Sequence, residues 1–192
     1  MIKQSIITGE KLLLIPIEPN HREKLRIYAQ DDRVWNLSTY IAHYGHDLFN
    51  TWFTLSYNNT LAEQELCYSI SYTDQLIGSS RYYSIKKVSR EISIGFTWIN
   101  PNYWGTFVNP EIKYLMLKNA FDNGFDRVYF HVDNLNVHSQ AAMKKLGAEV
   151  VSWNKWTRMR LDGSFREAIE YVVTREMWFD ISKKLQQRIL EK

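Results

Sequence analysis

The chain has 192 residues, a length at which one hydrophobic core is the usual outcome, so we expect a single domain over residues 1–192. Hydrophobic residues make up 45% and charged residues 23%, which is typical of a globular protein and excludes disordered and fibrous classes. Lys and Arg number 24 against 21 acidic residues, a surplus too small for a nucleic-acid footprint, so nucleic acid is not an expected partner.

A single cysteine and a polar N-terminal segment argue against a disulfide-bonded, secreted or membrane protein. Cys67 cannot form an internal disulfide, and its place in a β-type run predicts a buried thiol rather than a nucleophile. Residues 1–10 are too polar for a signal peptide, and no window reaches the roughly 18 apolar residues of a membrane span. We therefore expect a cytoplasmic protein with no membrane partner.

The N-terminal third of the chain predicts a strand followed by helices. Residues 11–18 form a β-rich run that ends at Pro19, and the apolar spacing of residues 21–30 predicts a helix. Between residues 31 and 60 the apolar side chains recur mostly at intervals of three or four. This spacing predicts short helices joined by a loop at residues 43–46.

The rest of the chain predicts hairpin-joined strands and then alternating strands and helices. Three β-type runs, at 65–72, 76–85 and 91–100, predict an antiparallel meander. The elements expected after them are a helix at 109–123, a strand at 127–132, a helix at 136–146, a hairpin of 148–161 with 167–174, and a C-terminal helix. The order predicts one mixed α/β unit.

The two central helices have recognisable start and stop residues. Asn109 is the predicted N-cap of the first, with Pro110 at its first helical position and Gly124 after its end. The second is predicted to run from Asn136 as N-cap to Gly147 as its stop.

The segment from Ile94 to Asn109 is the most informative part of the sequence. A strand leads into a tight turn and then a helix start, whose unpaired N–H groups and partial positive charge favour an anion. Gly105 lets the backbone approach a phosphate closely, and Gly95 inside the strand predicts a bulge or a close ligand. These residues alone are also compatible with a plain strand-to-helix turn.

Over nearly its whole length the sequence resembles the GNAT acetyltransferases, in particular the branch of ribosomal-protein N-acetyltransferases. Residues 104–109 are similar to the family loop that holds the pyrophosphate of coenzyme A, with Phe107 where a second glycine is common. The resemblance implies acetyl-CoA as co-substrate. The coenzyme site that it implies consists of Trp98, Ile99, Trp104, Gly105, Thr106, Phe107, Val108, Asn109, Asn136 and Ser139.

A second block, residues 132–148, resembles the family pattern Asn-x-x-Ser followed by Leu-Gly-Ala. By this resemblance Asn136 contacts the pantetheine arm, and Ser139 lies near the thioester sulfur and protonates the leaving thiolate. An ordinary N-cap and first-turn serine are the alternative reading. Many members carry a tyrosine acid where Met143 stands, and methionine cannot donate a proton, so Ser139 or water remains as the acid.

The acceptor amine also needs a base, because an amine with a pKa of about 10 is mostly protonated at neutral pH. Glu91 is the candidate, two residues before Ser93, where the related branch carries its glutamate; a solvated edge carboxylate is the alternative. By the same resemblance Trp35, Tyr40 and His43 border the acceptor pocket. The histidine spacings fit no zinc signature, so we expect no metal.

The resemblance implies an α/β (α+β) fold of GNAT type: a mixed, mostly antiparallel central sheet flanked by helices and splayed between strands 4 and 5. The expected reaction is acetyl transfer to a primary amine, of a protein N-terminus or a small molecule, by direct attack in a ternary complex, in a monomer or homodimer. Because the tyrosine is missing and the glutamate displaced, a non-catalytic acyl-CoA-binding module is the alternative. A nucleotide-binding protein is disfavoured, since no Walker or Rossmann glycine pattern occurs.

Overall fold

The computed structural model describes residues 2–35, 48–159 and 165–191. Within them, eight strands form one sheet in the order β1-β2-β3-β4-β5-β6-β8-β7. Only the β5–β6 pair is parallel, and the other neighbours are antiparallel. The strands are β1 Ile7–Thr8, β2 Leu12–Pro16, β3 Leu66–Tyr72, β4 Gln75–Lys86, β5 Glu91–Ile99, β6 Arg127–Asp133, β7 Glu149–Met159 and β8 Phe165–Thr174. The predicted mixed, mostly antiparallel sheet is confirmed.

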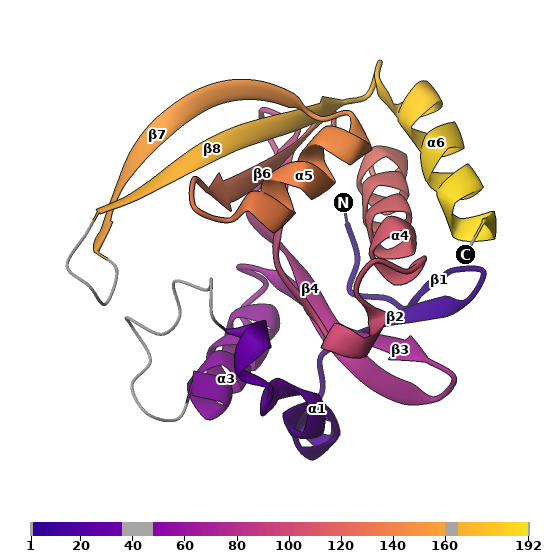
Figure 1. The fold of residues 1–192 in the computed structure, drawn as a ribbon, viewed down its shortest axis with the longest axis vertical. Coiled ribbons are helices and arrows are strands. Elements are labelled where there is room, and N and C mark those ends of the chain that lie inside the picture. Colours follow the sequence, from indigo (N-terminus) through magenta and orange to yellow (C-terminus); the bar gives the residue numbers. More distant parts are fainter. Residues whose placement is uncertain (1, 36–47, 160–164, 192) are drawn as a thin grey trace.

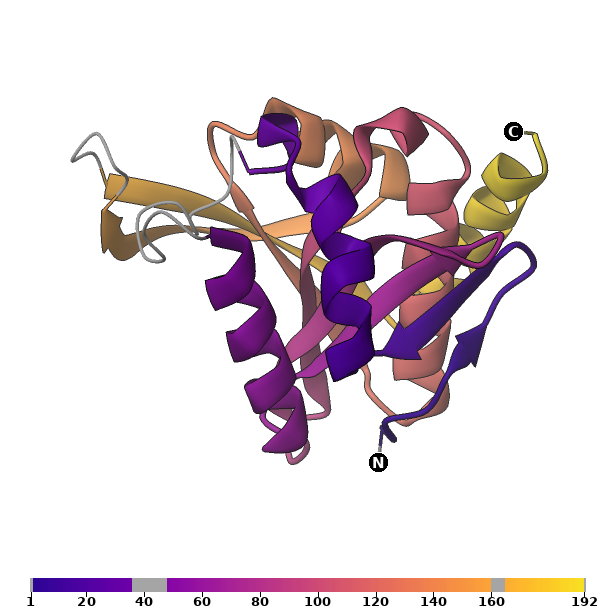
Figure 2. The same cartoon turned by 90° about the horizontal axis from the view of Figure 1, so that it is seen from below.

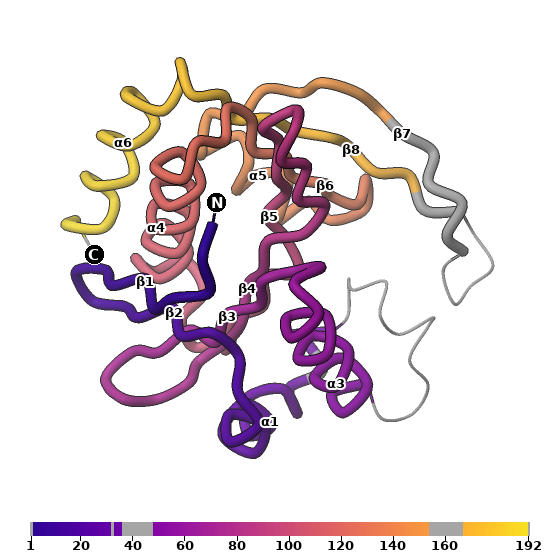
Figure 3. The backbone as a smooth tube through the Cα atoms, turned by 180° about the vertical axis from the view of Figure 1, so that it is seen from behind, coloured from indigo at the N-terminus to yellow at the C-terminus, as the bar shows by residue number. Residues whose placement is uncertain are grey.

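Helices cover both faces of this sheet (Figure 1). They are α1 Arg22–Ala29, α3 Leu48–Leu61, α4 Val108–Asp122, α5 Val137–Leu146 and α6 Trp178–Leu190, with short 3-10 turns at Pro19–His21, Asp32–Val34 and Pro101–Tyr103. The pair α1 and α3 lies side by side on one face (Figure 2). The other face carries α4, α5 and α6, so that α3 and α4 lie on opposite sides of β5 (Figure 3).

Each face has its own apolar core. The larger core lies under α4, α5 and α6 and includes Ile92 and Ile94 of β5. The smaller core lies under α1 and α3 and is largely aromatic. Trp52 and Trp98 pack there edge to face, with ring centroids 5.4 Å apart, a favoured aromatic geometry.

The helix α4 is the element on which both ends of the fold converge. The carboxylate of Glu111 accepts hydrogen bonds from the backbone N–H groups of Lys11 at 2.8 Å and Leu12 at 3.1 Å. On the same side, α6 packs along α4, and Lys11 Nζ donates to the carbonyl of Ile189 at 3.1 Å. The first strands and the last helix are thereby joined to one helix.

The predicted N-cap of α4 is wrong. The first helical hydrogen bond runs from Glu111 N–H to the Phe107 carbonyl at 2.9 Å, so Asn109 and Pro110 lie inside the first turn. The side chain that serves this end is Thr106, whose Oγ1 accepts from Val108 N–H at 3.3 Å. Proline has no N–H to lose anywhere in the first turn, so its position does not define where a helix begins.

The central strands separate where the sequence resemblance implies a splay. β5 and β6 pair from Glu91–Arg127 to Ser93–Tyr129 and no further, although β5 continues to Ile99 and β6 to Asp133. Beyond Ser93 and Tyr129 the two strands therefore share no ladder. This confirms the opening expected between the fourth and fifth predicted strands, 91–100 and 127–132, which are β5 and β6 because the short β1 was not predicted.

Candidate active site

A bulge in β5 lies just beyond the point of strand separation. Gly95 opposes Arg81 and Trp98 opposes Ser79, so two residues of β5 face the single residue between them on β4. Phe96 in this bulge has a φ of 51°, in the left-handed region that side-chain-bearing residues seldom adopt. The bulge expected from Gly95 is present, and it directly precedes Trp98.

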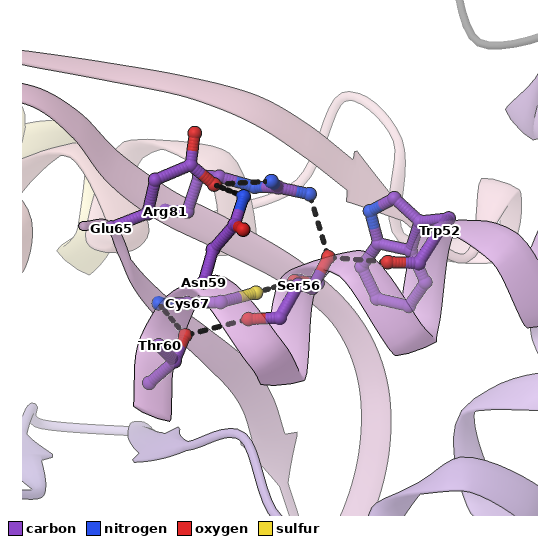
Figure 4. Close-up of polar contacts among 8 residues, drawn as sticks. Trp52, Ser56, Asn59, Thr60, Glu65, Cys67 and Arg81 are labelled. Carbon is purple, nitrogen blue, oxygen red and sulfur yellow. Dashed lines mark hydrogen bonds and ion pairs between the residues drawn. The ribbon is translucent and has the colours of Figure 1, made fainter. Parts of the chain in front are cut away.

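Arg81 holds the bulge from the α3 side of the sheet. Its buried guanidinium donates to Glu65 Oε2 and to Ser56 Oγ, each at 2.7 Å (Figure 4). It also lies 4.4 Å from the centre of the Phe96 ring. Ser56 in turn donates to the Trp52 carbonyl within α3 at 2.7 Å. This buried network joins the helix, the neighbouring strand and the bulge into one unit.

Cys67 lies beside this network and is buried, as the sequence predicts. Its N–H donates to Thr60 Oγ1 at 3.1 Å, and its sulfur lies 3.3 Å from Ser79 Oγ. The side chain is buried, and burial raises the pKa of the thiol. A thiol that is kept protonated is unreactive.

The turn between β5 and α4 leaves two backbone N–H groups without a hydrogen bond among the described residues. Gly105 has a φ of 75°, and a Cβ added there would meet only open space. Among the hydrogen bonds of the described residues, none uses the N–H of Phe107 or of Asn109. Trp104, 51% exposed, flanks the turn and is anchored by a 2.9 Å bond from its indole N–H to the Ile99 carbonyl. Such a helix start suits an anion.

The start of α5 lies at the end of β6, on the other side of the opening. Asn136 Oδ1 accepts from Ser139 N–H at 2.9 Å, which confirms the predicted cap. The cap uses only the oxygen of the Asn136 amide. Within the described part of the chain, its NH₂ group and the Ser139 hydroxyl form no hydrogen bond with protein, so both can contact a ligand.

A polar chain that the sequence does not reveal crosses the opposite face of the opening. The Tyr83 hydroxyl lies 2.8 Å from His131 Nδ1, His131 Nε2 lies 3.0 Å from Glu170 Oε1, and Ser152 Oγ donates to Glu170 Oε2 at 2.9 Å. The Tyr83 ring passes over Gly95, where an added Cβ would lie 2.9 Å from ring carbon Cε1. The absence of a side chain at Gly95 therefore lets Tyr83 reach across β5.

Glu91 is not brought to the opening. It lies at the paired end of β5, where it forms ion pairs with Lys86 at 3.4 Å and Arg127 at 3.6 Å. Beyond Arg127, its neighbour on the parallel strand, β6 runs six more residues to Asp133, roughly 20 Å at about 3.3 Å per residue, before α5 begins. Burial raises the pKa of Glu91, but hydrogen bonds from Ser89, Lys86 and Tyr129 and the Lys86 charge outweigh it, and the net pKa is lowered.

Of the three residues predicted to border the acceptor pocket, the structure describes only Trp35. Trp35 lies in the smaller core, 6% exposed, with its ring 6.1 Å from that of Trp98 and its indole N–H bonded to the Ala29 carbonyl. It has little surface left for a ligand. Tyr40 and His43 lie outside the described residues.

The side chains of Trp98 and Ile99, each 7% exposed, are likewise packed in the cores. Any contact that Trp98 and Ile99 make with a ligand therefore runs through their backbone. Across the described ranges, no group of three or more His, Cys, Asp or Glu side chains is arranged to hold a metal. No helix in those ranges is both long and apolar enough to cross a bilayer.

Comparison with known proteins assigns this arrangement to a family. The model of the acetyltransferase (GNAT) domain matches residues 11–149, and a comparison with curated proteins gives no match. A solved structure described as "probable acetyltransferases (GNAT family)" from Chromobacterium violaceum is 25% identical, with a TM-score of 0.82 over 92% of this chain and 89% of that chain.

Two further solved structures share the fold at lower identity. RimJ from Mycobacterium smegmatis, solved with CoA-disulfide, is 16% identical, with a TM-score of 0.76 over 97% of this chain and 90% of its own. RimL, a ribosomal L7/L12 α-N-protein acetyltransferase solved with coenzyme A, is 15% identical, with a TM-score of 0.75 over 90% and 99%. Since the family model spans most of the chain, including the bulge, the opening and both helix starts, this chain belongs to the GNAT acetyltransferases and is an acyltransferase.

Proposed function

We propose that the chain is an N-acetyltransferase that moves the acetyl group of acetyl-CoA to a primary amine by direct attack in a ternary complex. The observation that carries this proposal is the separation of β5 and β6 beyond Ser93 and Tyr129, next to the starts of α4 and α5. An extended ligand can pass between strands that share no ladder, while helix starts hold its phosphates. Coenzyme A in the RimJ and RimL structures supports the choice of co-substrate.

The start of α4 is the proposed pyrophosphate site. The N–H groups of Phe107 and Asn109 supply the donors, and Gly105 permits close approach of the backbone. Trp104, Thr106 and Val108 shape the turn, in which Thr106 already uses its hydroxyl to serve Val108. Phe107 therefore replaces the common glycine and still contributes its N–H.

The thioester is proposed to lie in the opening between the strands. Backbone groups of Trp98 and Ile99, next to the bulge, are the proposed donors to the thioester carbonyl as negative charge develops there. On the α5 side, the Asn136 amide is the proposed contact for the pantetheine arm, and Ser139 lies one turn into the helix.

The acceptor proton needs a different route from the one expected at Glu91. We propose that the Tyr83–His131–Glu170 chain accepts it, because His131 lies two residues beyond the last paired residue of β6, at the opening itself. As the amine attacks, its proton passes to the Tyr83 oxygen, and the Tyr83 proton passes to His131 Nδ1. The Glu170 carboxylate stabilises the imidazolium that results.

The acceptor is proposed to be a protein N-terminus or a small-molecule amine, met in the cytoplasm by a monomer or homodimer. The name of RimL, an α-N-protein acetyltransferase, supports the first class. A non-catalytic acyl-CoA-binding module is the rival proposal, and it differs in one measurable respect. Such a module binds coenzyme A without consuming acetyl-CoA in the presence of any amine.

The test is calorimetry with coenzyme A, followed by an acetyl-CoA consumption assay over peptides with free N-termini, polyamines, amino acids and aminoglycosides. Gly105→Ala should weaken coenzyme A binding about tenfold or more, because it strains the turn and adds a Cβ beside the phosphates. Gly124→Ala is the matched control, since Gly124 also has a positive φ, 88°, and open space but lies at the far end of α4. Absence of coenzyme A binding by the unaltered protein would refute the proposal.

A further inference from the structure

Lys113 places a buried ammonium group in the opening between the strands. Its side chain extends from α4, the residue is 7% exposed, and Nζ lies 3.3 Å from Thr97 Oγ1 and 5.1 Å from the centre of the Phe130 ring. Thr97 belongs to the bulge of β5, and Phe130 lies on β6 just past its last paired residue. The charge therefore lies where the two strands share no hydrogen bonds.

This cation has too few partners for a purely structural role. An ammonium has three donors, and within the described chain it makes one hydrogen bond, to a Thr97 hydroxyl that Ser80 also contacts at 2.8 Å. None of the ion pairs among the described residues involves Lys113. Burying a charge without a counter-ion costs several kcal/mol. A cation kept in such a place indicates that an anionic or electron-rich partner comes with the ligand.

The path of the coenzyme leads to this group. Asn109, in the proposed pyrophosphate site, lies four residues before Lys113, so the two share one face of α4 about 6 Å apart along its axis. Both also line a small cavity of about 10 Å³, room for roughly one water, which lies between α4, Met143 of α5 and Arg188 of α6. A ligand anchored at the start of α4 and extended into the opening passes directly by Lys113.

We propose that Lys113 is a catalytic residue, which donates a proton to the sulfur of coenzyme A as the thioester breaks; this rests on the proposed function. In this step the amine nitrogen bonds to the carbonyl carbon, and the carbon–sulfur bond breaks. The electron pair left on sulfur takes a proton from Lys113 Nζ, which becomes a neutral amine. The proton that the acceptor lost leaves through Tyr83 and His131, and solvent returns one to Lys113.

The acidity of Lys113 suits this task. Burial lowers the pKa of the ammonium from 10.5 to about 8. An ordinary thiol has a pKa of about 8.5, so proton transfer to a thiolate is close to thermoneutral, the condition under which general acids work best. Before transfer, the positive charge also stabilises the thiolate. Ser139, the acid expected from the sequence, has neither a charge nor a comparable pKa.

The experiment compares coenzyme A with desulfo-coenzyme A, in which hydrogen replaces the thiol group, by calorimetry. The unaltered protein should bind coenzyme A about tenfold more tightly than the desulfo analogue near pH 8, where about half of Lys113 still carries its charge and the thiol begins to ionise. Lys113→Met should abolish this preference. Lys118→Met is the matched control: Lys118 is on the same helix but is exposed and paired with Asp122, so this variant should keep the preference.

Two further measurements make the outcome decisive. The pKa of the bound coenzyme A thiol, followed by thiolate absorbance, should lie below that of free coenzyme A, and a value at or above the free one overturns the proposal without any variant. With an acceptor found in the amine screen, Lys113→Met should lower turnover at saturating substrates by about 10²-fold or more.

Equal weakening of both ligands by Lys113→Met would make Lys113 a structural or phosphate-contacting residue and overturn the proposal. Failure of the unaltered protein to bind either ligand would instead refute the proposed function.

Discussion

The missing side chain at Gly95 leaves room for the Tyr83 ring to cross β5. Because Gly95 has no Cβ, the Tyr83 ring crosses β5, and its hydroxyl meets His131 two strands away at 2.8 Å. The contact links β4 and β6 across β5, at the place where the ladder between β5 and β6 stops. One glycine thus connects the backbone geometry of the opening to its proton chemistry.

Tyr83→Phe should therefore lower turnover about 10²-fold at saturating amine while the fold is retained, because only the relay hydroxyl is lost. Gly95→Ala should act in the same direction by displacing the ring. The measurement is steady-state kinetics as a function of pH, with thermal unfolding as a check of folding. Tyr129→Phe serves as the control, since its hydroxyl contacts Glu91 at the paired end of the strands. Unchanged turnover in Tyr83→Phe would exclude the relay.

At the scale of elements, helix α3 and the bulge of β5 form one unit through the Arg81–Glu65 pair. Removing one partner of a buried ion pair leaves an uncompensated charge, which typically costs about 3–5 kcal/mol of stability. We expect Glu65→Leu and Arg81→Met each to destabilise the protein strongly, and the double variant to cost less than these two single changes summed. Urea denaturation of the four proteins measures this coupling. Strict additivity would show that the pair does not act as a unit.

The helix ends illustrate which elements can be predicted from sequence. The Asn136 cap accepts a hydrogen bond from the N–H three residues later, so it depends only on nearby residues. The structure confirms it. The end of α4 is equally local: Gly124 has a φ of 88°, and Phe125 N–H bonds back to the Ala120 carbonyl. Its start was missed because Asn109 and Pro110 are tolerated throughout a first turn.

The candidate site was less predictable than the fold, because its groups meet across strand registers. Tyr83 and Glu170 are 87 positions apart, and only the pairing of the strands places them on either side of His131. Lys113 appears in the sequence as an ordinary helical lysine, and its burial follows from how α4 packs over the opening. Periodicity predicts faces of single elements but not the positions at which elements cross.

For the molecule as a whole, Lys113 makes stability depend on pH above neutrality. The folded-state pKa of about 8 is below the ordinary 10.5, so between these values the unfolded chain binds more protons, and the free energy of unfolding rises with pH. The penalty is fully present below about pH 8 and disappears toward pH 10.5, for a total of roughly 3 kcal/mol. Lys113→Met should lack this rise, measured as the difference between the two proteins by urea denaturation from pH 7 to 10. Parallel curves would show that the ammonium is solvated.

The joining of β1, β2 and α6 to α4 has a consequence for protection against proteolysis. A ligand that binds the start of α4 favours conformations in which that helix is formed, and Glu111 and Lys11 carry this preference to the neighbouring segments. Saturation with coenzyme should therefore slow amide exchange and proteolysis at the last turn of α6, more than 70 residues away in the sequence from the start of α4. Fraying at the end of α6 would then report the fraction of the protein that has coenzyme bound.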